Sequence, residues 1–308
     1  MSVSAPALEQ FQSRFLQAGS LEKLSHLRFA SRHRIEGAYS GRHRSRQRGG
    51  SAEFVDYREY APGEDIRRID WKVLGRTGRS YVRLYQDETN LHCTMMIDAS
   101  GSMLFGGYGS GKLGTKLAYA QYLSTALSYL IGSQRDQVGL AIAADGLMEL
   151  LPPAGTQSHI QRLQRRIESI STSPATNLAL ALRQTFDRLT RRGVLMVMSD
   201  FLVEDFDAVY SMLRLFRHRR CEVIVLHLIH PDEEQLPEGG AYRFEGLEND
   251  GLVDCSAAQV REAYEKGFAA HISAVRGIAL SAGCDYRRVS LATPYLQTLM
   301  GFLVEREG

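Results

Sequence analysis

Two short apolar runs that each end in an aspartate constrain the fold of this chain more than any other feature. LHCTMMI, residues 91–97, leads into Asp98, and VLMVMS, residues 194–199, leads into Asp200. Short apolar runs closed by a sharp polar break are typical of parallel strands that are buried on both faces. Because ligands of open α/β sheets bind beyond the carboxyl ends of the strands, we expect both aspartates at that edge of one sheet.

Strand and helix patterns alternate along the chain after residue 91. This alternation predicts an α/β fold with a doubly wound, mainly parallel sheet flanked by helices. Further strands are expected at 138–144, 223–229 and 285–290, with a short antiparallel partner at 148–151. Apolar residues at helical spacing predict helices at 113–131, 157–169, 177–190, 205–216, 257–281 and 293–306.

The chain is expected to have two parts. Residues 1–90 form a basic N-terminal arm and an extension, in which alternating patterns predict strands at 54–60 and 80–85. We expect the second of these strands to pair beside the strand at 91–97. Residues 91–308 form the α/β domain, with an insertion at about 231–256 in which Asn249-Asp250-Gly251 predicts a hairpin.

Oxygen-bearing side chains cluster at the expected carboxyl edge of the sheet. Ser100 and Ser102 follow Asp98 in the segment DASGS, and Thr176 directly precedes a helical pattern. Carboxylate and hydroxyl oxygens without His or Cys suit a hard cation such as Mg²⁺, and Mn²⁺ or Ca²⁺ would accept the same donors. Each residue also has an ordinary role, since Asp and Ser favour turns and Thr favours helix N-caps. Together with Asp200, the set predicts a metal site.

This arrangement resembles the metal-ion-dependent adhesion site of von Willebrand factor A domains. The resemblance covers residues 90–308 and is carried by DASGS at 98–102, by Thr176 and by the Asp of MSD at 198–200. It implies that the hydroxyls bind Mg²⁺ directly, that the aspartates often act through water, and that an acidic side chain of a protein ligand fills a free position. Few direct carboxylates leave the ion electron-poor, which favours binding over catalysis. Phe201 follows Asp200 where many A domains have Gly.

A second resemblance extends over residues 40–308. YREYAPGEDIRRIDWK at 57–72, SGSM at 100–103, RFEGLE at 243–248 and DYRR at 285–288 are similar to the domain-of-unknown-function 58 family. Members of that family are often encoded beside MoxR-type AAA+ ATPases and are thought to act as their von Willebrand A partners. The resemblance implies an adaptor or cofactor of such an ATPase, with a chaperone-like role in the assembly or maturation of protein complexes.

Two classes of function remain open from the residues themselves. One is a non-catalytic, Mg²⁺-dependent protein-interaction module, and the other is a metal-dependent phosphoryl-transfer enzyme with Asp98 as nucleophile or metal ligand. Haloacid-type phosphatases usually need a second Asp two residues after the first, where this chain has Ser100. GGYGSGK at 106–112 matches GxxxxGK, but Leu113 stands where a phosphate-binding loop needs Ser or Thr. We therefore expect a protein that is not an enzyme.

Basic residues concentrate in the N-terminal part of the chain. Residues 1–50 contain nine Lys or Arg against three Glu, although the whole chain carries a formal net charge of only +2. This arm would meet an acidic partner or fold back on the acidic body, and without interleaved aromatic residues it is not expected to bind nucleic acid.

A partner-docking surface anchored by the tryptophan would be formed by Arg58, Arg67, Arg68 and Trp71. The alternative, which a lone tryptophan favours, is that Trp71 packs the extension onto the domain.

The location is expected to be cytoplasmic, without membrane association. No apolar run approaches the roughly 18 residues of a transmembrane helix, and the N-terminus lacks the pattern of a secretory signal. None of the four cysteines lies in a CxxC pair, which fits a reducing compartment. His227, inside an expected strand, is expected to be buried with its hydrogen bonds satisfied.

Overall fold

The computed structural model describes residues 13–16, 27–29, 52–61, 66–87, 91–108, 113–248 and 251–307. The chain divides into two compact units, of which the larger comprises residues 1–32 and 91–308 and the smaller comprises residues 33–90. The described residues 13–16 contact the larger unit. The Ser13 hydroxyl donates to Glu168 at 2.6 Å, and the ring of Phe15 lies edge-on to that of Tyr122 at 4.7 Å between centroids.

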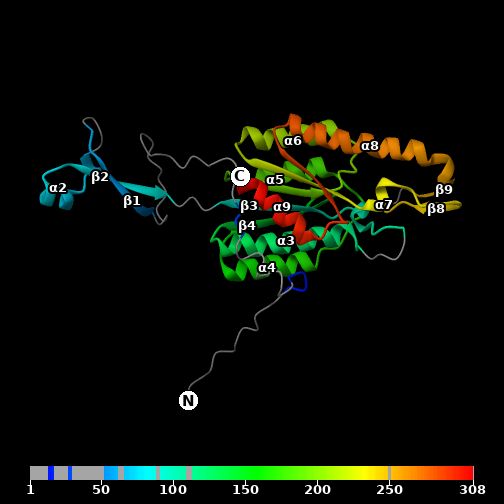
Figure 1. Cartoon of the computed structure of the whole chain (residues 1–308), viewed down its shortest axis with the longest axis horizontal. Coiled ribbons are helices and arrows are strands. Elements are labelled where there is room, and N and C mark those ends of the chain that lie inside the picture. The colour runs from blue at the N-terminus through cyan, green and yellow to red at the C-terminus, as the bar shows by residue number, and fades with distance from the viewer. Residues whose placement is uncertain are drawn as a thin grey trace, which may run out of the picture. The chain divides into compact units, whose positions relative to one another are not determined.

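A six-stranded sheet forms the centre of the larger unit (Figure 1). Its strands are β3 (His92–Asp98), β4 (Gln137–Ala144), β5 (Gly146–Ala154), β6 (Val194–Ser199), β7 (Glu222–Ile229) and β10 (Asp285–Ser290). They lie in the order β10-β7-β6-β3-β4-β5, and β5 at the edge is antiparallel to β4 while the other pairs are parallel. Counted from β3, this is the 3-2-1-4-5-6 order of a doubly wound sheet. The expected fold class and the antiparallel partner at 148–151 are therefore confirmed.

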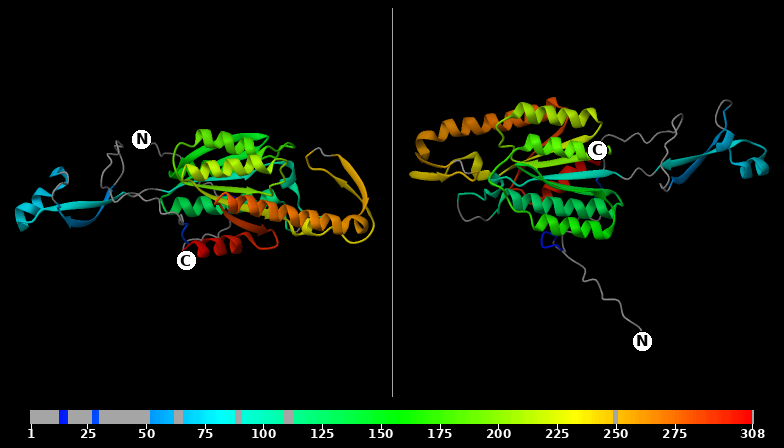
Figure 2. Two further views of the ribbon diagram at one scale, coloured as in Figure 1. Left: turned by 90° about the horizontal axis from the view of Figure 1, so that it is seen from above. Right: turned by 180° about the vertical axis from the view of Figure 1, so that it is seen from behind.

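Helices cover both faces of the sheet (Figure 2). One layer contains α3 (Lys116–Ser133), α4 (Gln157–Glu168) and α9 (Tyr295–Glu307), and the other contains α5 (Leu178–Arg188), α6 (Phe206–His218) and α8 (Ala257–Ser281). The helix expected from residue 113 begins three residues later, because the Thr115 hydroxyl caps it by accepting the Ala118 N–H at 3.1 Å.

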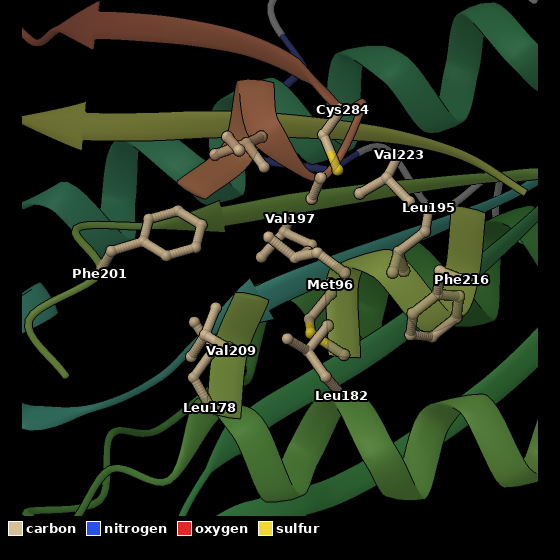
Figure 3. Close-up of a cluster of buried hydrophobic side chains, with 14 of the residues drawn as sticks. Met96, Leu178, Leu182, Leu195, Val197, Phe201, Val209, Phe216, Val223 and Cys284 are labelled. Carbon is tan, nitrogen blue, oxygen red and sulfur yellow. The ribbon is translucent and has the colours of Figure 1, made fainter. Parts of the chain in front are cut away.

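The core on the α5, α6 and α8 side explains why the strands are so apolar (Figure 3). Met96 of β3 and Val197 of β6 meet Leu182 of α5 and Phe216 of α6 in one buried cluster. Met95 is also buried but lies outside this cluster, as expected when alternate side chains of a strand point to opposite faces. Full burial of such a side chain stabilises the fold by about 1.5–3 kcal/mol.

The insertion between β7 and α8 contains the predicted hairpin. A short helix, α7 (Pro231–Glu234), precedes two antiparallel strands, β8 (Ala241–Glu245) and β9 (Leu252–Ser256). The Gly246 N–H donates to the Gly251 carbonyl at 2.9 Å and closes the described part of the turn. The hairpin expected around Asn249-Asp250-Gly251 is confirmed, although residues 249 and 250 lie outside the described residues.

The smaller unit contains β1 (Ala52–Glu59), η1 (Ile66–Arg68), α2 (Trp71–Thr77) and β2 (Tyr81–Asp87). β2 pairs antiparallel with β1, so the expectation that residues 80–85 pair beside strand 91–97 is wrong. The physical reason is that parallel neighbours, β4 and β6, already take both edges of β3. Arg58 and Arg67 are exposed, and the side chain of Arg68 is not among those that the structure describes. Trp71 is 62% exposed, so its own unit does not bury it.

Candidate functional site

The site lies at the point where the sheet changes direction. β3 and β6 are parallel neighbours, and each leads into a helix on a different face of the sheet, β3 into α3 and β6 into α6. Connections that diverge in this way leave a crevice beyond the carboxyl ends of the two central strands. Asp98 ends β3 and Asp200 follows β6, so the topology places both aspartates at this crevice.

Asp98 is held rigidly at the bottom of the site and is only 2% exposed. One carboxylate oxygen accepts the Ser100 N–H at 2.9 Å, and the other accepts the Ser199 hydroxyl at 2.6 Å. Burial, followed by the nearby charge of Asp200, raises the pKa of Asp98 to about 6, although the hydrogen bonds from Ser199 and Ser100 oppose the rise. A cation beside Asp98 would restore its charged form.

The two serines of the DASGS segment lie side by side. The hydroxyl oxygens of Ser100 and Ser102 are 3.0 Å apart, and both residues are buried. Ser102 lies in the short helix η2 (Gly101–Leu104), and its hydroxyl lowers the pKa of Asp200. The structure therefore brings together four of the five predicted ligands, Asp98, Ser100, Ser102 and Asp200.

Thr176 lies in a loop that runs along the DASGS segment. The loop is fixed there by the Ser173 N–H, which donates to the Ala99 carbonyl at 2.8 Å. Thr176 is partly exposed, and among the described residues no hydrogen bond joins its side chain to the other four. The alternative role of Thr176 as a helix N-cap is wrong. Asn177 caps α5 instead, because its N–H is fixed to Ala144 and its side chain accepts the Leu180 N–H at 3.0 Å.

Lys116, which the motif did not reveal, reaches the same crevice from the start of α3. Its side chain is 0% exposed, and Nζ donates to Asp200 Oδ2 at 2.6 Å and to Glu233 Oε1. Glu233 of α7 also accepts the His230 N–H at 2.8 Å. A sequence signal did exist, since Lys116 precedes the buried residues Ala120, Leu123 and Leu127 at helical spacing. A lysine on an apolar stripe is unusual enough to suggest a buried ion pair.

Burial and the ion pairs act in opposite directions on the pKa values of Lys116, Asp200 and Glu233. Burial alone lowers the pKa of Lys116, but Asp200 and Glu233 outweigh it and the net direction is upward. Burial alone raises the pKa of Asp200, but the adjacent Lys116 ammonium makes the net direction downward. Burial raises the pKa of Glu233 despite the same ammonium. Lys116 and Asp200 therefore form a stable charged pair.

The donor chemistry of the site fits a hard divalent cation. Lys116 pairs with Asp200 and Glu233, whereas no ion pair with Asp98 is found among the described residues, and the hydroxyl pair supplies neutral oxygen donors. Within the described part of the chain, no group of three or more His, Cys, Asp or Glu side chains is arranged to hold a metal ion. Metal binding here would therefore depend on the two serines.

Phe201 keeps the shape of the loop after Asp200. Its φ of 54° lies in the left-handed region that Gly adopts most easily, which explains why Gly is expected at this position. The conformation lets the Phe201 N–H donate to the Ser199 hydroxyl oxygen at 2.8 Å, while His271 Nε2 contacts the Asp200 carbonyl at 3.0 Å. Full burial of the Phe201 ring offsets the strain, which is on the order of 1–3 kcal/mol.

His227 lies behind the site and is buried, as predicted. Its Nδ1 contacts the Tyr286 hydroxyl at 3.0 Å, and its ring packs against His271 at 5.4 Å between centroids. Burial, followed by the nearby His271, lowers the pKa of His227 to about 3. His227 is therefore neutral and adds no charge to the crevice.

The chain is similar in sequence to a mycobacterial protein and in fold to several solved structures. Uncharacterized protein Rv1480 of Mycobacterium tuberculosis is 25% identical over 286 residues, which is 91% of this chain and 87% of that protein. An aerotolerance-related membrane protein from Bacteroides fragilis is 18% identical, with a TM-score of 0.47, over 70% of this chain and 98% of that chain. The VWA domain of SpRpn10 is 14% identical, with a TM-score of 0.39, over 69% of this chain and 95% of that chain.

None of the helices in the described residues combines the length and apolar character that crossing a bilayer requires. The family model described as "Protein of unknown function DUF58" matches residues 56–274, most of the smaller unit's described residues and most of the larger unit. The chain belongs to the DUF58 family.

Proposed function

We propose that this protein is a non-catalytic, Mg²⁺-dependent protein-interaction module that serves a MoxR-type AAA+ ATPase in the assembly or maturation of protein complexes. One observation carries the proposal. Four predicted oxygen ligands, from the ends of β3 and β6 and the start of η2, lie together and buried at the switch point of the sheet. When bound, Mg²⁺ would supply an electron-poor centre that attracts a carboxylate from a protein ligand.

The residues have distinct tasks in this proposal. Ser100 and Ser102 hold the ion through their hydroxyls, and Asp98 and Asp200 compensate its charge from positions fixed by Ser199 and Lys116. Thr176 completes the set from the loop beside the DASGS segment. Because Lys116 already neutralises much of the charge of Asp200, Asp200 would compensate the ion only in part, and the ion would still attract an external anion.

The competing phosphoryl-transfer function fits the geometry less well. A nucleophilic carboxylate needs an oxygen that is accessible to the phosphorus atom. Both oxygens of Asp98 accept hydrogen bonds, and the residue is almost fully buried. The position two residues later is Ser100, which cannot act as the acidic proton donor of a haloacid-type phosphatase.

A second contact is proposed on the smaller unit. Trp71 and Ile66 are 62% and 59% exposed, with Arg58, Arg67 and Arg68 in the same unit. Exposed aromatic residues among arginines are typical of energetically dominant interface positions. This surface would meet the ATPase in the cytoplasm while the metal site binds an acidic side chain, without nucleic acid or membrane.

Thermal unfolding with and without Mg²⁺ tests the metal site. Mg²⁺ at 100 times its dissociation constant should stabilise the wild type by about 2.7 kcal/mol, because it binds the folded state. Ser102→Ala, which removes one hydroxyl donor but no charge, should lose most of this gain. Asp187→Asn, an exposed carboxylate on α5, serves as the control and should keep it. An equal Mg²⁺ shift in Ser102→Ala and wild type would contradict the assignment.

Capture of the ATPase tests the partner. The protein should retain a MoxR-type ATPase in Mg²⁺ and release it in EDTA, and Ser102→Ala should retain little in either condition. Retention that is unchanged by EDTA would exclude metal-bridged docking.

A phosphatase screen in millimolar Mg²⁺ addresses the alternative, because turnover that Asp98→Asn abolishes would favour the enzyme.

A further inference from the structure

The tip of the β8–β9 hairpin contacts the loop that carries the two serines. Glu248 Oε1 accepts the Ser102 N–H at 3.0 Å, although the two residues are 146 positions apart in the sequence. The same serine has its hydroxyl 3.0 Å from that of Ser100. A carboxylate of the chain's own insertion therefore lies beside the hydroxyl pair.

The close approach of the hairpin depends on a glycine in the metal-binding loop. A Cβ atom on Gly101 would lie 2.1 Å from the Leu247 carbonyl oxygen and 3.0 Å from Glu248 Cγ. Real Cβ atoms essentially never show the first distance, and it involves backbone that cannot turn aside. Gly101 thus removes the steric barrier that would keep Glu248 away from Ser102.

Aromatic contacts hold the hairpin over the site from its other side. Phe244 of β8 packs edge-on against Tyr108 at 5.9 Å between centroids, and Tyr108 packs against Phe105 at 5.2 Å. The Tyr108 N–H donates to Asp232 of α7 at 3.0 Å. The hairpin therefore rests on the segment between η2 and α3 as well as on Ser102.

We propose that Glu248 is an internal ligand that occupies the free position of the metal site until a partner's acidic side chain displaces it. This inference rests on the proposed function. A carboxylate is the chemical group that an electron-poor Mg²⁺ attracts, and the Glu248 carboxylate already accepts a hydrogen bond from the backbone of Ser102.

Displacement of Glu248 would be a local event. Leu247 is 43% exposed and Glu248 is partly exposed, so the tip can leave the site without uncovering the core. An incoming carboxylate must then compete with one that is already tethered, and this competition lowers the apparent affinity for weak acidic partners. The hairpin would select ligands that offer further contacts besides the carboxylate.

Water coordination of bound Mn²⁺ tests the inference on the full chain. Mn²⁺ is paramagnetic, and it speeds the relaxation of water protons in proportion to the water molecules it coordinates. Glu248→Ala should still bind Mn²⁺, but the relaxation enhancement per bound ion should rise roughly 1.5-fold as an octahedral ion goes from about two waters to about three. Glu245→Ala, which removes an exposed carboxylate from the same hairpin, is the matched control and should behave as wild type.

The possible outcomes separate the two proposals. Equal enhancement in wild type and Glu248→Ala, with Mn²⁺ bound to both, would overturn the internal ligand and leave the metal site standing. An equal rise in Glu245→Ala would also overturn it, because the effect would then be one of general charge. Failure of every protein, wild type included, to bind Mn²⁺ would overturn the proposed function and this inference together.

Discussion

Replacing Lys116 by methionine is the sharpest test of the charge arrangement in the crevice. Methionine keeps the length and apolar stem of lysine but removes the ammonium that pairs with Asp200 and Glu233. All three side chains are at least 90% buried, with exposures of 0%, 5% and 10%, so the two carboxylates would be left without compensation in a poorly solvated site. Removing one partner of a buried ion pair costs about 3–5 kcal/mol. We expect Lys116→Met to lose this much free energy of unfolding in EDTA.

Urea unfolding followed by circular dichroism measures the loss, and two further proteins make the result specific. Arg288→Met breaks the pair of Arg288 with Glu234, whose side chains are 44% and 36% exposed, and should cost less than about 1 kcal/mol. Lys116→Met combined with Glu233→Gln should recover part of the loss, because one unpaired carboxylate is removed. If Lys116→Met cost no more than Arg288→Met in EDTA, the assigned role of the buried ammonium would be refuted.

Two further predictions address the ligands themselves. The pKa of Asp98 is raised to about 6 in the folded protein from 3.8, so its stabilisation is fully present below about pH 4 and is lost as the pH rises through 6. In urea titrations in EDTA, the free energy of unfolding of the wild type should therefore fall by up to roughly 3 kcal/mol relative to that of Asp98→Asn between pH 4 and 7. A difference between the two proteins that does not change with pH would contradict the raised pKa. Thr176→Ala should weaken the stabilisation by Mg²⁺ but leave the stability in EDTA nearly unchanged. Asn177→Ala should lower the stability in EDTA by about 1 kcal/mol, because the helix cap is lost. Thermal unfolding measures both, and a loss of stability in EDTA for Thr176→Ala but not for Asn177→Ala would exchange the two roles.

Periodicity was sufficient to predict the larger unit because its elements are strongly amphipathic or fully apolar. The helix expected at 257–281 has those bounds, and the apolar runs at 91–97 and 194–199 are the central strands. That both strands end at the same edge of one sheet followed from a general rule of doubly wound sheets and needed no knowledge of side-chain contacts. The aspartates at the ends of these strands were predictable for the same reason.

Pairing and helix boundaries were less accessible from the sequence. The alternating pattern at 80–85 identified a strand but not its partner, since alternation fixes which face is apolar and not which edge is free. Similarly, the apolar stripe of α3 predicted the helix, but capping by the Thr115 hydroxyl set its first residue. The cap of α5 was misplaced by one residue because Thr176 and Asn177 are both good capping residues.

The least predictable part of the site is its charge balance, because the groups that set it are distant in sequence and individually ordinary. Lys116 begins a helix, Glu233 lies in a four-residue helix of the insertion, and Glu248 lies at a hairpin tip. Lys116 nevertheless pairs with both Asp200 and Glu233, and Glu248 contacts Ser102. A fixed ammonium takes up the charge of Asp200, and Asp98 remains buried without a described cationic partner. A divalent ion at the hydroxyl pair would compensate Asp98, and the tethered carboxylate of Glu248 would then be held by attraction to the ion. On these proposals, the insertion would both support the site through Glu233 and compete with its ligand through Glu248.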